Sequence, residues 1–302
     1  MSWDIAVAGS VTFDEITTPR GHRDHVMGGS AVYFSLSACR YSQVHMSAVV
    51  GEDGEEELAS LCQELPIDRS GVSVSPMPTF RSHLEHDFNT WMTSSVRTEP
   101  GAYVGWHPRL TGAAMNAPVL FIGSTMPALQ REAQLQSNAR LSGADSMAVF
   151  ISEQHDAVSE VVQNADILFL DRRELSLLSG HALEDFEKGA KSLLGKGRLR
   201  AVVVKRGPLG ATLVTQGTCL SMPAAPVPGV DDPTGAGDAF AGGFLGACAR
   251  AERDDEAFFP EALHDALLSA APAISVFGTH ALRAFAYSER ALPAPSGSAF
   301  QR

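Results

Sequence analysis

The sequence predicts an α/β protein with a mainly parallel central sheet and helices on both of its faces. Short apolar runs alternate with longer segments of helical periodicity along most of the chain, and this alternation is typical of parallel strands joined by helices. Between residues 72 and 104 the pattern changes to short alternating segments, which favour antiparallel strands. We therefore expect one domain over residues 1–290, with a small β-sheet formed by residues 11–27 and 72–104.

Each element is predicted from its own run of residues. The apolar runs predict strands at residues 4–8, 44–50, 119–122, 147–151, 167–170, 201–205 and 211–215. Helical periodicity predicts helices at residues 30–41, 55–65, 128–139, 155–164, 183–194, 239–249 and 261–277. Residues 291–302 are rich in proline and serine, so we expect a disordered tail there.

The composition argues against several classes of protein. The chain has 302 residues, of which 44% are hydrophobic, and a net charge of −12 without a basic stripe. Such a chain can bury a large core, and it does not suggest a nucleic-acid partner. The four cysteines form no C-x-x-C pair, so we expect reduced thiols. No apolar run reaches the length of a membrane span and no leader pattern is present, which predicts a cytoplasmic protein without a membrane partner.

The most informative motif is Asp232-Pro-Thr-Gly-Ala-Gly-Asp238, which is followed by small apolar residues. Its glycines let a ligand approach the backbone closely. The small residues predict a helix packed tightly on a sheet, and the N-terminus of a helix suits a phosphate group. An aspartate there can accept a proton from an attacking hydroxyl. The motif indicates phosphoryl transfer to an alcohol, and the alternative is an ordinary capped helix start.

A second glycine motif lies in the N-terminal half. Gly28-Gly29 precedes the helix predicted at residues 30–41, and Gly51-Glu-Asp-Gly54 follows the strand predicted at residues 44–50. Alone, each is an ordinary turn. Together with the C-terminal motif, and in this order over residues 4–285, they resemble the two signatures of the ribokinase-like (PfkB) family of carbohydrate and nucleoside kinases.

The resemblance implies a ribokinase-like, Rossmann-type sandwich whose small sheet is a lid over the substrate. It implies that Asp238 is the catalytic base and that the amides of Gly235, Ala236 and Gly237 form an anion hole for the transferred phosphoryl group. It also implies that ATP lies along the C-terminal half of the chain. The ATP-binding residues that it implies are Lys205, Gly207 and Gly210.

The resemblance implies an acceptor site built from both halves of the chain. The implied substrate-binding residues are Asp14, Gly28, Gly29, Ser30, Tyr33 and Asp232. The carboxylate of Asp14 suits a diol because it accepts two hydrogen bonds. Tyr33 departs from the asparagine usual in sugar kinases, and its ring fits another hydroxyl pattern or a stacked ring. Asp232 matches a position that in some members lies near a monovalent cation such as K⁺, and the alternative is a turn cap.

The segment from Asp171 to Glu174 is similar to the Asn-x-x-Glu element with which the family organises Mg²⁺ and phosphates. Asp171 stands where the family has asparagine, and a carboxylate is also an oxygen ligand for Mg²⁺. The alternative is a capping box at the start of a helix. Both interpretations can hold at once.

The resulting prediction is an ATP-dependent, Mg²⁺-requiring kinase that phosphorylates a hydroxymethyl group of a small sugar. A nucleoside kinase of the same family is the alternative, since Tyr33 and Trp91 suit base stacking. A non-catalytic sugar- or nucleotide-binding regulator is less favoured because the base and the glycines are present. The first strand is not followed by G-x-G-x-x-G and the chain has no P-loop motif, which argues against a nicotinamide oxidoreductase and a P-loop kinase.

Two further expectations concern the small sheet. Three histidines fall in or near it, and we expect His83, His86 and His107 to be scattered surface residues rather than a metal site. The family resemblance also implies a homodimer through the small sheet, whose exposed apolar face would drive the pairing.

Overall fold

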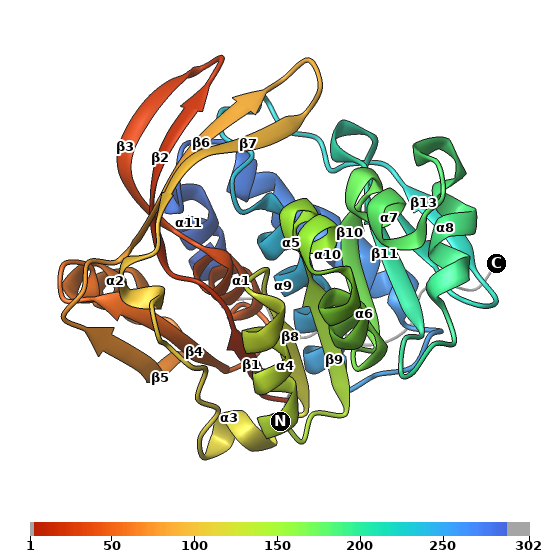
Figure 1. Ribbon diagram of the computed structural model, residues 1–302, viewed down its shortest axis with the longest axis horizontal. Coiled ribbons are helices and arrows are strands. Elements are labelled where there is room, and N and C mark those ends of the chain that lie inside the picture. The colour runs from red at the N-terminus through yellow and green to blue at the C-terminus, as the bar shows by residue number, and fades with distance from the viewer. Residues whose placement is uncertain (1–2, 289–302) are drawn as a thin grey trace.

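The computed structural model describes residues 3–288, so the tail predicted at residues 291–302 lies outside the described residues. The chain forms a large sheet with helices on both faces and a smaller sheet that stands apart from it (Figure 1). The predicted fold class is confirmed.

The large sheet has nine strands. Their order is β13 (Cys219–Met222), β12 (Ala211–Val214), β11 (Ala201–Lys205), β10 (Ile167–Asp171), β9 (Leu141–Asp145), β8 (Val119–Ile122), β1 (Ile5–Ala8), β4 (Val44–Gly51) and β5 (Ile67–Ser75). All pairs from β11 to β5 are parallel, and β12 and β13 are added antiparallel at one edge. The carboxyl ends of β9, β10 and β11 therefore meet at one edge of the sheet.

Helices cover both faces of this sheet (Figure 1). One face carries α1 (Ser30–Ala38), α9 (Ala236–Ala251), α10 (Phe259–Ile274) and α11 (His280–Ser288). The other carries α5 (Ala148–Glu153), α6 (His155–Gln163), α7 (Arg172–Ser179) and α8 (Phe186–Leu193). The remaining α-helices of the described residues are α2 (Glu55–Cys62), α3 (Ala113–Asn116) and α4 (Pro127–Gln136). None of the helices in this part of the chain is long and apolar enough to cross a membrane.

The small sheet has the order β3 (Gly21–Gly28), β2 (Thr12–Thr18), β6 (Phe80–Asp87) and β7 (Met92–Glu99). The pairs β2–β3 and β6–β7 are antiparallel, as expected, whereas β2 and β6 pair in parallel. The boundary predicted at residue 72 is wrong, because residues 72–75 belong to β5 of the large sheet. As part of an edge strand, these residues are only partly buried.

One predicted strand is also wrong. The apolar run at residues 147–151 lies mostly in α5, where Ile151 is buried against the neighbouring helices. The strand is β9, whose sequence Leu-Ser-Gly-Ala-Asp is too polar to stand out as a buried run. Helix α11 was not predicted, and the start of α7 was predicted only as the alternative interpretation of Asp171 and Glu174.

Aromatic side chains fill the core between the large sheet and α9. Phe169 on β10 is fully buried and lies edge-on to Phe121, Phe240 and Phe244, with ring centroids 5.5–6.3 Å apart. Such contacts add specific geometry to the burial of apolar area. This cluster fixes α9 on the strands whose ends form the candidate site.

Replacing Phe169 by alanine should therefore destabilise the fold strongly. We expect Phe169→Ala to lower the free energy of unfolding by about 3–5 kcal/mol, because it removes a buried ring and leaves a cavity. Urea unfolding measures the change. The control is Leu135→Ala on α4, whose side chain is 71% exposed, for which we expect a change within about 0.5 kcal/mol. A loss below about 1 kcal/mol in Phe169→Ala would contradict this description of the core.

Candidate active site

The turn before α9 is held in place by close packing. Gly235 is the N-cap of α9 and has a φ of 74°, in the left-handed region that favours glycine. A Cβ atom at Gly235 would lie 2.1 Å from Cγ of Tyr33, so the glycine is also required sterically. The first turn of α9 contains Ala236, Gly237 and Asp238, and the N–H groups of a first helical turn have no partners within the helix. Outside the helix, the amide of Ala236 donates a long hydrogen bond to the carbonyl oxygen of Pro233, at 3.3 Å. The predicted anion-hole residues thus form a helix N-terminus.

Asp238 presents a carboxylate at this helix start. Its side chain is partly exposed, but its Oδ1 atom is buried and has no hydrogen-bond partner among the described residues. Burial raises the pKa of Asp238 to about 7, and the neighbouring Asp145 adds to the shift, whereas Lys205 opposes it. A carboxylate with a pKa near neutrality is suited to accept a proton at physiological pH.

An ion pair that the sequence analysis missed lies beside Asp238. Asp145, at the end of β9, accepts a hydrogen bond from Nζ of Lys205, at the end of β11, at 2.7 Å. Both side chains are largely buried. Burial would lower the pKa of Lys205, but Asp145 and Glu174 raise it above its ordinary value. Nζ of Lys205 lies 3.0 Å from the place of a Cβ atom on Gly237, so the cation is in contact with the first turn of α9.

The predicted metal ligands lie between these strands. Asp171 ends β10 and is in register with Lys205. Asp171 Oδ1 accepts from the amide of Glu174, and Glu174 Oε2 accepts from the amide of Asp171, each at 2.8 Å. The capping box is therefore present. Burial raises the pKa of Glu174 to about 8, with Lys205 opposing the shift and Asp145 and Asp171 adding to it.

The acceptor side of the site begins with Asp14 on β2. Its carboxylate is buried and accepts from Ser82 Oγ at 2.5 Å and from Thr12 Oγ1 at 3.0 Å. Burial raises the pKa of Asp14 to about 6. A Cβ atom on Gly28 would lie 2.7 Å from Oδ2 of Asp14 and 3.1 Å from Cε2 of Tyr33. The small sheet and α1 thus bring Asp14, Gly28 and Tyr33 together.

Tyr33 lies between the two halves of the site. Its ring is 1% exposed, and its hydroxyl has no hydrogen-bond partner among the described residues. Burial raises the pKa of Tyr33 well above its ordinary value, and the nearby carboxylates of Asp232, Asp14 and Asp238 add to the shift. The hydroxyl therefore stays protonated and is available as a buried donor.

Asp232 is fully buried under the same turn. Its Oδ1 accepts from the amide of Thr234 at 2.9 Å, and its Oδ2 accepts from the amide of Gly278 at 3.1 Å. Asp232 therefore caps the turn, as its alternative interpretation predicted, and it also lies close enough to Tyr33 to affect its pKa.

Three predicted residues have structural contacts of their own. Ser30 and Ser10 exchange hydrogen bonds between backbone N–H and side-chain oxygen at 3.0 Å, which ties the start of α1 to the end of β1. A Cβ atom on Gly29 would lie 2.4 Å from the carbonyl oxygen of Ser10, and one on Gly210 would lie 2.0 Å from that of Met222. By contrast, a Cβ atom on Gly207 would meet only open space, so a ligand can approach that backbone.

The expectation about the histidines is wrong for His86. Its side chain is buried and bonds to Thr234 and Thr93, at 2.8 and 2.9 Å. Thr234 lies 148 residues from His86 in the sequence, so no local pattern predicts this contact.

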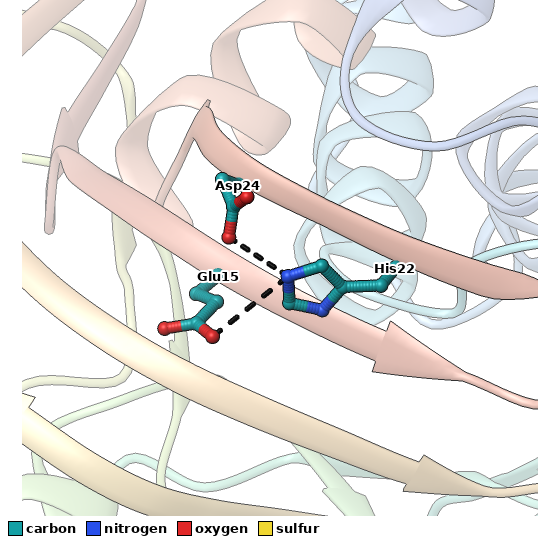
Figure 2. Close-up of side chains that lie close together, drawn as sticks. All are labelled: Glu15, His22 and Asp24. Atoms are coloured by element: carbon teal, nitrogen blue, oxygen red, sulfur yellow. Dashed lines mark hydrogen bonds and ion pairs between the residues drawn. The ribbon is translucent and has the colours of Figure 1, made fainter.

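In the part of the chain that the structure describes, the one group with metal-ligand spacing is Glu15, His22 and Asp24 on β2 and β3 (Figure 2). Their side chains are 44–74% exposed, and they do not belong to the buried site around Asp14.

A family assignment agrees with this geometry. The family model described as pfkB family carbohydrate kinase matches residues 4–282. The chain belongs to the PfkB family of kinases. Among curated proteins, this PfkB kinase is 30% identical over 257 residues to the cytidine kinase of Thermococcus kodakarensis, over 82% of this chain and 89% of the relative.

Solved structures share the fold of this PfkB kinase. The nucleoside kinase of Burkholderia thailandensis in complex with inosine superposes with a TM-score of 0.71 at 20% identity, covering 93% of this chain and 94% of that one. Ribokinase from Cryptococcus neoformans var. grubii in complex with ADP gives a TM-score of 0.74 at 18% identity, covering 94% and 99%. These likenesses confirm the ribokinase-like architecture.

The buried carboxylate of Asp238 should cost the kinase stability. Because burial raises its pKa to about 7, the charged form is less stable in the folded chain than in the unfolded chain, where an aspartate titrates near pH 4. We expect Asp238→Asn to raise the free energy of unfolding by about 1–3 kcal/mol at about pH 8, and the gain to vanish below about pH 4, where both states are protonated.

Urea unfolding at several pH values measures this gain. The matched control is Asp156→Asn, at a fully exposed position, for which no gain is expected. A variant Asp238→Asn that is less stable than the wild type at about pH 8 would show that the carboxylate is compensated by its surroundings.

Proposed function

We propose that this PfkB kinase transfers the γ-phosphoryl group of ATP to a hydroxymethyl group of a small polyol. The observation that carries the proposal is the buried Oδ1 of Asp238, unpartnered among the described residues, at the start of α9 and beside the Lys205–Asp145 ion pair. A base, a helix N-terminus and a cation close to one another are the parts that phosphoryl transfer needs.

The proposed reaction follows from these positions. Asp238 accepts the proton of the acceptor hydroxyl, whose oxygen forms a bond to the γ-phosphorus of ATP. The bond between the γ-phosphorus and the β,γ-bridging oxygen breaks, and that oxygen leaves as part of ADP. The N–H groups of Gly235, Ala236 and Gly237 and the ammonium of Lys205 stabilise the charge on the transferred group. Gly207 and Gly210, in the turn after β11, stay the proposed neighbours of the nucleotide.

The acceptor side supports a nucleoside as the first choice and a small sugar as the second. Asp14 offers a buried carboxylate to a pair of hydroxyls, and Tyr33 offers a hydroxyl donor. The sequence alone favoured a sugar. The 30% identity to a cytidine kinase over most of both chains now supports the nucleoside class. The intact base and glycine turn argue against a non-catalytic regulator.

The residues near the phosphate site have the charge and the oxygen donors that suit a magnesium ion. Asp145, Asp171 and Glu174 surround one lysine, so the cluster carries an excess of negative charge, and carboxylate oxygens are ligands that Mg²⁺ prefers. We propose Asp171 and Glu174 as the residues that hold it. When bound, Mg²⁺ would neutralise the charge of the phosphates. A monovalent cation near Asp232 stays a prediction.

We also propose a homodimer through the small sheet. Strand β7 is at its edge and exposes Met92 and Val96, which are 43% and 55% accessible. An unpaired strand that carries apolar side chains favours association.

The proposed function is tested by ADP release on a panel of nucleosides and sugars. We expect turnover of at least one acceptor that carries a hydroxymethyl group, with cytidine as the first compound. Asp238→Ala should lower kcat by about 10²- to 10⁴-fold, which is the usual contribution of a general base.

The matched control is Asp156→Ala, in which a fully exposed carboxylate is removed and the rate should not change. No turnover by the wild type across the panel would contradict the kinase proposal. A near-normal rate for Asp238→Ala on a true substrate would contradict the role of this residue.

A further inference from the structure

His86 connects the small sheet to the turn that precedes α9. It is the last residue but one of β6 and is 7% exposed. Its Nε2 atom is 2.8 Å from Oγ1 of Thr234, and its Nδ1 atom is 2.9 Å from Oγ1 of Thr93 on β7. In Figure 1 the segment that leads into α9 passes beside the free end of β6 and β7. The imidazole therefore bridges two separate parts of the chain.

A second bond joins the same two parts. Thr18, at the end of β2, donates from Oγ1 to the carbonyl oxygen of Asp231 at 2.9 Å. The pairing of β2 with β6 places Thr17 beside Glu85, so Thr18 and His86 lie at the same end of the small sheet. This end is thus bonded to both sides of Asp232.

The turn has little freedom once these bonds are made. Thr234 directly precedes Gly235, the N-cap of α9, and its amide donates to Asp232 at 2.9 Å. The ring of Tyr33 leaves no room for even a Cβ atom on Gly235. The turn therefore contacts α1 through Gly235 and the small sheet through Thr234.

We propose that His86 is a positioning residue that couples closure of the small sheet to the placement of the anion-hole turn. The inference rests on the proposed function, because it assigns the turn to the transferred phosphoryl group. The His86–Thr234 bond requires the small sheet to lie on the core, because it joins β6 to a turn that is 148 residues away in the sequence. The turn is then held in its active position only when the sheet covers the site.

This coupling has a chemical consequence. An open site admits water, which can take the phosphoryl group in place of the acceptor. If the turn needs His86 to be well placed, the kinase is active only after the sheet has excluded water. Loss of the bond should lower the rate of transfer more than the affinity for ATP, because ATP is proposed to lie mainly against β11 and the turn after it.

The first test is kinetic. We expect His86→Ala to lower kcat with the best acceptor by about tenfold, with the KM for ATP changed by less than about threefold, as for the loss of one buried hydrogen bond near the reacting group. His86→Gln retains a polar atom near the position of Nε2 and should recover much of the rate. Thr234→Val should have a similar effect, and the double variant should be no slower than the slower single variant.

The control is His83→Ala on the same strand, whose ring faces Glu15 and Glu85 instead of the turn. It should leave kcat and KM unchanged. Additive effects of His86→Ala and Thr234→Val, or a His86→Ala variant with the wild-type kcat, would overturn the proposal.

The second test does not depend on activity. Hydrogen exchange of the amides at residues 235–238 should be faster in His86→Ala than in the wild type, while exchange in the β8–β11 core stays unchanged. Unchanged exchange at residues 235–238, or an equal increase throughout the chain, would overturn the coupling. If the wild type turns over no acceptor but exchange responds as expected, the proposed function fails and the coupling stands. If the wild type is active and His86→Ala changes neither kcat nor exchange, the proposed function stands and the coupling fails.

Discussion

The close packing of α9 on α1 is the constraint on which the candidate site depends. Ser37 of α1 donates to the carbonyl oxygen of Ala239 at 2.6 Å, and a Cβ atom on Gly242 would lie 2.7 Å from the carbonyl oxygen of Phe34. Larger residues on this face would push α9 away from α1. Because α9 cannot shift, Asp238 is held beside the ends of β9 and β11. The N-terminal turn of α9 packs against Tyr33.

The fixed position of α9 gathers several carboxylates in a small space, which lowers stability but favours catalysis. Asp238, Asp145 and Glu174 are gathered around one lysine, and burial raises the pKa of each carboxyl group. Burial removes much of the water that would otherwise stabilise these charges. A divalent cation and a base that accepts a proton near neutral pH are the chemical outcomes that such a cluster favours. The arrangement at the start of α9 therefore lowers the stability of the fold and makes the carboxylate of Asp238 more reactive.

Local patterns in the sequence were enough for the parts of the site that lie close together in the chain. The turn and Asp238 belong to one short motif, and the glycines of that motif are required by its geometry. Asp145 was missed because β9 is polar and the apolar run after it resembles a strand. His86 was misjudged because its partner lies 148 residues away. Pairs of this kind depend on how strands and loops meet in space, which periodicity does not encode.

The central claim is that the carboxylate of Asp238 is poised to act as a base. Carbon-13 NMR titration of the aspartate carboxyl groups tests it directly, with the signal assigned by its loss in Asp238→Asn. We expect a pKa of about 7 for Asp238, and a higher pKa in Lys205→Met, because the lysine lowers it. Titration near pH 4, as for an exposed aspartate, together with no response to Lys205→Met, would contradict the claim.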